Sequence, residues 1–97
     1  MKVNFNVPFL NLKGQPIKLN DEITTIKDVI CAQLFSSNIG DKDAKYKRFK
    51  ICLKLNNSNS EVEITPDEVN IILDSCSELN VGGYGQVYNL LNGESQL

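Results

Sequence analysis

Histidine is absent from this sequence, and cysteine is scarce. Without an imidazole, the chain can form neither a histidine metal site nor a catalytic triad with histidine as its base. The three cysteines, Cys31, Cys52 and Cys76, are widely separated and never form a C-x-x-C pair. This spacing is typical of reduced thiols rather than of a disulfide framework.

Long apolar runs are also missing. No stretch reaches the roughly 18 apolar residues that a membrane-spanning helix needs. The N-terminal residues lack the apolar core and small-residue cleavage site of a signal peptide. We therefore expect a cytosolic protein that is not secreted by a signal peptide and has no membrane partner.

The composition is that of an ordinary folded chain. Its 97 residues are 41% hydrophobic and 23% charged, which is enough for one compact domain over residues 1–97 and too little for two. Since a chain of this length can bury a sufficient core, neither a metal nor a disulfide is required for stability.

Hydrophobic periodicity predicts a mostly helical α+β fold, with a small N-terminal β-hairpin packed on three to four α-helices. Val3, Phe5 and Val7 alternate with polar residues, as in a strand with one buried face. Glycine and proline at 14 and 16 mark a turn, so we expect the hairpin over residues 3–19. The helices are expected at 25–36, 41–55, 66–80 and 85–92.

Capping signals place two of these helices. Thr25 with Asp28 approximates a capping box, and Thr65 followed by Pro66 combines an N-cap with proline at the first helical position. We expect the glycines of residues 80–83 to end the third helix, because glycine readily adopts the left-handed C-cap conformation.

The expected helix at 41–55 is strongly cationic. Its apolar face should contain Ala44, Phe49, Cys52 and Leu53. Much of the remaining surface is basic: Lys42, Lys45, Lys47, Arg48, Lys50 and Lys54.

The glycine-rich string at residues 83–88 echoes the end of a protein-kinase phosphate loop. No lysine or arginine follows Lys54, so the downstream kinase residues are missing, and neither a Walker loop nor a dinucleotide fingerprint is complete. We interpret residues 82–85 as helix punctuation, that is, as residues that separate the end of one helix from the start of the next. The alternative is that their backbone amides bind an anion.

Other reactive groups also have simple structural interpretations. The cysteines fall on helix faces that we expect to be buried. The acid pair at 61/63 suits the exposed face of a strand, and the pair at 67/68 suits the first turn of a helix. Binding of a hard cation is the alternative interpretation of these acids. We therefore predict that the protein is not an enzyme and has no catalytic, cofactor-binding or metal-binding residues.

Charge is divided unevenly along the chain. Residues 1–60 carry a net charge of +5, and residues 61–97 carry −7. Three interpretations follow: the charges compensate within the domain, opposite faces of neighbouring copies meet head to tail, or the basic helix contacts a phosphate backbone. A pI near 5.0 and a single arginine make the phosphate interpretation the weakest.

The order of motifs resembles a family of short, uncharacterised proteins of tailed bacteriophages and prophages. The resemblance lies in residues 3–17, 25–29, 45–49, 61–68 and 85–91. It implies a phage product in the host cytoplasm, with association with the virion as an alternative location. It transfers no catalytic residue.

We therefore predict a protein–protein interaction module, either a virion or assembly component or an inhibitor of a host or defence protein, binding a host or phage protein or another copy of itself. The alternative is a nucleic-acid-binding accessory of replication or recombination. The predicted contact residues are Lys42, Lys45, Tyr46, Lys47, Arg48 and Lys50.

Overall fold

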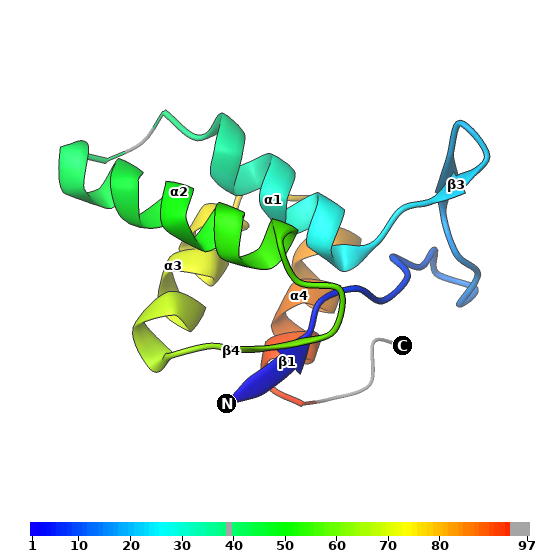
Figure 1. Cartoon of the computed structure of the whole chain (residues 1–97). Helices are drawn as coiled ribbons and strands as arrows, with labels where there is room; N and C mark the ends of the chain where they lie inside the picture. The colour runs from blue at the N-terminus through cyan, green and yellow to red at the C-terminus, as the bar shows by residue number, and fades with distance from the viewer. Residues whose placement is uncertain (39, 94–97) are drawn as a thin grey trace.

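Four helices and two pairs of short strands form the described part of the chain, residues 1–38 and 40–93 of the computed structural model (Figure 1). The helices are α1 (Ile26–Ser36), α2 (Lys42–Asn56), α3 (Pro66–Ser75) and α4 (Val81–Leu91). The strands are β1 (Lys2–Asn4), β2 (Lys18–Leu19), β3 (Glu22–Ile23) and β4 (Glu61–Glu63). The predicted fold class, mostly helical α+β, is confirmed.

The first strand pairs with a distant partner rather than within the expected 3–19 hairpin. β1 is antiparallel to β4, with Val3 opposite Val62, and the Ile64 N–H donates to the Met1 carbonyl over 2.7 Å. Val3 and Phe5 are buried, as their alternation predicted. Alternation identifies the buried face of a strand but not its partner, which explains the error.

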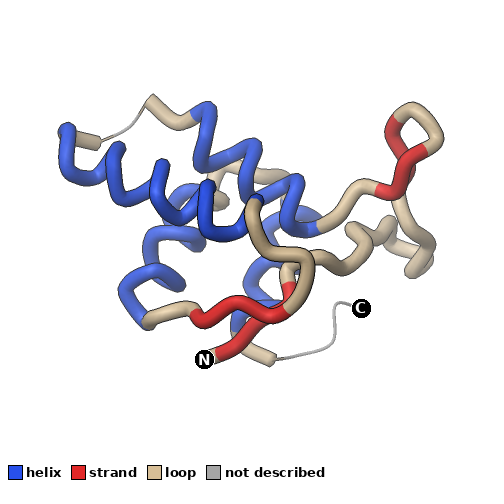
Figure 2. The backbone as a smooth tube through the Cα atoms, viewed as in Figure 1, coloured by secondary structure: helices blue, strands red, loops and turns tan. Residues whose placement is uncertain are grey.

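The rest of the expected hairpin is part of an arm, residues 9–24, that extends beyond the helices (Figure 2). Phe9 accepts a hydrogen bond from the Ile17 N–H and donates one to the Thr24 carbonyl. At its end, β2 and β3 are joined by Asn20 and Asp21, whose φ angles of 53° and 66° are those of a type I′ hairpin turn. This hairpin was not predicted.

The two capping predictions are confirmed. In α1 the Thr25 hydroxyl accepts from the Asp28 N–H, and the Asp28 carboxylate accepts from the Thr25 N–H. Thr65 and Glu68 form the same reciprocal box at the start of α3, with Pro66 in the first turn. Each box satisfies backbone donors that have no partner within the helix.

The boundary between α3 and α4 differs from expectation. α3 ends at Ser75 rather than at residue 80, and α4 begins at Val81 rather than at 85. The Asn80 side chain accepts from the Gly83 N–H over 2.8 Å and caps α4. The glycines of 82–85 therefore lie inside a helix, and their interpretation as helix punctuation was wrong.

One hydrophobic core joins β1, β4 and all four described helices. Its most deeply buried large side chains are Phe5, Ile26, Ile30, Leu55, Ile64, Ile72 and Val87. α1 and α2 pack side by side over this core (Figure 1).

The buried face of α2 is only in part the one expected, since Cys52 is buried as predicted but Phe49 and Leu53 are not. Ile51, Cys52 and Leu55 enter the core, whereas Phe49 and Leu53 remain exposed. The apolar residues of this helix form two stripes on opposite faces, and both have helical spacing. Only the positions of the neighbouring elements determine which stripe is buried.

Candidate functional site

The predicted contact residues all lie on α2, but they do not all face solvent. Lys42, Lys45, Tyr46, Lys47 and Lys50 are exposed. Arg48 is half-buried, and its Nε donates to the Ser75 Oγ of α3 over 2.9 Å. The structure therefore gives Arg48 a role in holding α2 against α3.

Large apolar side chains lie among the exposed lysines. On α2, Tyr46, Phe49 and Leu53 follow i, i+3, i+7 spacing and are 62%, 45% and 44% exposed, and Phe35 of α1 is 70% exposed. The Tyr46 and Phe49 ring centroids are 6.4 Å apart, and the Lys50 Nζ lies 5.4 Å from the Tyr46 centroid. Such a group of exposed apolar side chains is typical of an interaction surface.

We name this surface the basic–aromatic face. At 3.6 residues per turn, its α2 members lie within about 140° of the helix circumference, opposite the buried stripe. Its members are Phe35, Lys42, Lys45, Tyr46, Phe49, Lys50 and Leu53.

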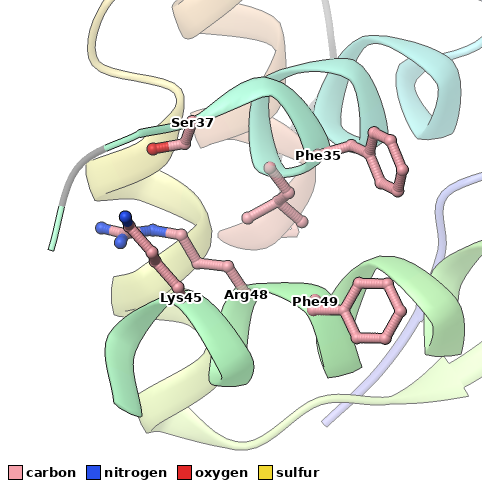
Figure 3. A pocket seen from close by; sticks show the side chains of 6 residues that line it. Phe35, Ser37, Lys45, Arg48 and Phe49 are labelled. Carbon is pink, nitrogen blue, oxygen red and sulfur yellow. The ribbon is translucent and has the colours of Figure 1, made fainter. Parts of the chain in front are cut away.

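An open hollow of about 250 Å³ lies between α1 and α2 on this face (Figure 3). Leu34, Phe35 and Phe49 line it together with Ser37, Lys45 and Arg48. The two rings lie at one side of the hollow, while the nitrogen-bearing ends of the lysine and arginine side chains lie at the other (Figure 3). The hollow therefore has an apolar side and a cationic side.

Among the described residues, Lys54 is the only lysine of α2 that forms an ion pair with a carboxylate. The Lys54 Nζ lies 3.0 and 3.2 Å from the two carboxylate oxygens of Glu68. Burial disfavours ionisation of Glu68, but the Thr65 N–H and the Lys54 ammonium outweigh this effect and lower the pKa of the carboxyl. Lys42, Lys45, Lys47 and Lys50 form no ion pair with a described carboxylate.

The structure brings two of the cysteines together, which the sequence did not indicate. The Cys31 Sγ lies 3.9 Å from the Cys52 carbonyl, and the Cys52 Sγ lies 3.8 Å from the Cys31 carbonyl. Burial and the neighbouring Cys52 raise the pKa of Cys31 to about 12, and burial raises that of Cys76 to about 11. Both thiols are therefore protonated near neutral pH.

The glycine segment at 82–85 does not present a free set of amides to an anion. The Gly83 N–H is already bound to the Asn80 side chain, and Gly83 is buried. Phosphate loops need backbone N–H groups that point at the ligand. The geometry thus weakens the anion-binding alternative.

Among residues 1–38 and 40–93, no three metal-ligating side chains converge. Within the same residues, no helix has the length and apolar character needed to cross a membrane.

Phe35, Phe49 and Leu53 were not predicted to be surface residues. The i, i+3, i+7 spacing of Tyr46, Phe49 and Leu53 shows a second apolar stripe beside that of Ile51 and Leu55, but it does not show which of the two is exposed.

Fold and surface together define a small, mostly helical α+β protein with an exposed basic–aromatic face. No protein-family model matches the chain, and the searches of curated proteins and of solved structures found no significant match either. The geometry of this face is therefore the basis of the functional argument.

Proposed function

We propose that this chain is a non-enzymatic protein–protein interaction module that binds its partner through the basic–aromatic face. The observation that carries the proposal is the exposure of four large apolar side chains on two adjacent helices, among lysines that have no described carboxylate partner. Aromatic anchors in a polar surround are typical of binding hot spots.

The cysteines support a role other than catalysis. A catalytic thiol needs a lowered pKa, whereas burial raises the pKa of Cys31 and Cys76. Cys52 is buried against α1. These side chains act as core residues.

The resemblance to short proteins of tailed phages and prophages supplies the biological setting of this proposal. In that setting the module acts in the host cytoplasm, as a component of the virion or its assembly or as an inhibitor of a host or defence protein. Each of these roles requires an accessible surface that recognises another protein.

The test uses one variant on the face and one matched control. Phe49→Ser removes a half-exposed ring from the face, and Leu12→Ser removes a 94% exposed apolar side chain from the arm. Both proteins serve as bait in host and infected-cell lysates, and a captured protein is then purified and titrated against each.

We expect one protein to bind wild type and Leu12→Ser equally and Phe49→Ser at least about tenfold more weakly. A partner that binds all three proteins alike, or the lack of any partner, would overturn the assignment of this face. The melting temperature of each variant is measured as well, and it distinguishes a loss of binding from a loss of folding.

Nucleic-acid binding is the second candidate, favoured by the exposed lysines of α2. Four of them lie within residues 42–50 and are available to phosphates. A short duplex retained at low salt and released at high salt, with loss of retention in Lys45→Glu, would favour this candidate. Light-scattering mass measured with and without the duplex provides the readout.

A further inference from the structure

The hollow between α1 and α2 has the size of one large side chain. A cavity of about 150 Å³ can hold a benzene molecule. The hollow here has about 250 Å³ and opens to solvent on the basic–aromatic face. It can therefore receive a leucine or phenylalanine side chain from a partner.

The lining determines how such a side chain would lie. Phe35 and Phe49 provide the apolar side, where an incoming apolar group loses contact with water. Lys45 lies at the cationic side and is exposed, so it can reach a carboxylate on the same partner segment. A ligand that satisfies both sides carries an apolar group and an acid close together.

The lysines around the hollow also favour a negatively charged partner. Lys42 and Lys50 are exposed on the same face, Lys42 three residues before Lys45 and Lys50 directly after Phe49 in the chain. Since neither pairs with a described carboxylate, an acidic partner gains these contacts without breaking an internal ion pair.

A double-stranded nucleic acid fits this surface less well. Its phosphates would meet the lysines, but its bases are stacked inside the duplex and would leave Phe35, Phe49 and Leu53 without apolar contacts. The only arginine, which is the residue most often used for base readout, is bound to Ser75. The apolar half of the face therefore favours a protein partner.

We infer that the partner presents an acidic segment with one large apolar side chain, which enters the hollow while neighbouring carboxylates pair with Lys45 and the flanking lysines. This inference rests on the proposed function and adds the chemistry of the partner.

The experiment is a titration of the isotope-labelled full chain followed by nuclear magnetic resonance, which detects weak binding residue by residue. The main probe is a short glutamate-rich peptide with one central phenylalanine. A second peptide replaces that phenylalanine with serine, and a short DNA duplex is the third probe. Phe49→Ser and Leu12→Ser are the matched protein variants.

We expect saturable shifts around Phe35, Lys45 and Phe49 with the phenylalanine peptide. The serine peptide should bind at least about tenfold more weakly, since it cannot fill the hollow. Phe49→Ser should weaken binding similarly, whereas Leu12→Ser should not. Raising the ionic strength from about 0.05 M to about 0.5 M should weaken binding further.

Equal binding of the two peptides would overturn the inference, because charge alone would then explain it. Tighter binding of the duplex than of the phenylalanine peptide would overturn it in favour of nucleic acid. The natural partner captured with wild type separates the two proposals: if it requires Phe49 but is not displaced by the phenylalanine peptide, the proposed function stands and the inferred partner chemistry fails.

Discussion

Replacing Gln86 with leucine should destabilise the protein strongly, because this side chain holds the arm to α4. Gln86 is 4% exposed. Its Oε1 accepts from the Leu10 N–H over 2.9 Å, and its Nε2 donates to the Leu10 carbonyl over 2.8 Å. The amide thus imitates one rung of an antiparallel ladder between residues 76 positions apart.

The size of the destabilisation follows from the two backbone groups of Leu10 that lose their hydrogen-bond partners. Gln86→Leu removes both partners of Leu10, and each unpaired backbone group costs about 1–2 kcal/mol at a half-buried site. The expected loss is about 2–4 kcal/mol, a large share of the roughly 5–15 kcal/mol that stabilises a typical domain. The melting temperature should fall by at least about 8 °C.

Urea unfolding followed by circular dichroism measures this loss, and amide hydrogen exchange at Leu10 reports the local contact. Gln15→Leu, at an exposed position of the arm, is the matched control and should change stability by less than about 0.5 kcal/mol. A loss below about 1 kcal/mol in Gln86→Leu, or unchanged protection of the Leu10 amide, would refute the reasoning.

Three further predictions concern helix α4, the α2–α3 ion pair and the thiols. Gly85→Ala should stabilise the protein by about 0.5–1 kcal/mol, because the new Cβ meets no atom within 4 Å. Gly83→Ala should give no increase in melting temperature in the same experiment, since its Cβ would lie 3.1 Å from the capping oxygen of Asn80. The lowered pKa of Glu68 contributes stability that is present above its ordinary pKa of 4.5 and is lost as pH falls through the folded-state pKa. Urea unfolding from neutral to acidic pH should therefore show a shallower loss for Glu68→Gln, and an identical pH profile would contradict this assignment. With pKa values of about 12 and 11, Cys31 and Cys76 should react slowly with a colorimetric disulfide reagent at mildly alkaline pH until the protein unfolds; a rapid reaction of the folded protein would argue against buried, protonated thiols.

Short patterns in the sequence correctly predicted the structural features that depend only on residues close together in the chain. Thr65 and Glu68 lie three residues apart, so their capping box depends on nothing outside the first turn of α3. The buried face of β1 also follows from the alternation of Val3 and Phe5 with polar residues. These features needed no knowledge of distant segments.

Features that depend on distant contacts were harder to predict. Whether Phe49 or Ile51 faces the core depends on where α1 and α3 lie, and the partner of β1 lies about sixty residues away in the chain. The lysines were recognisable from the sequence as surface residues. The apolar half of the basic–aromatic face was not, because an exposed aromatic stripe and a buried one have the same spacing.

The arm also affects how the length and sequence of this chain can change during evolution. The Phe9 N–H donates to the Thr24 carbonyl over 2.8 Å, so the backbone leaves and re-enters the body at one point. Since loop-closure entropy grows only slowly with length, residues between these two ends can be shortened, extended or exchanged at small cost. The Leu10–Gln86 contact and the backbone hydrogen bonds of Ile17 with Phe9 and Thr24 limit this freedom to residues 11–16 and 18–23. The site is therefore a natural point for insertions, at which a new segment can be added without repacking the helices.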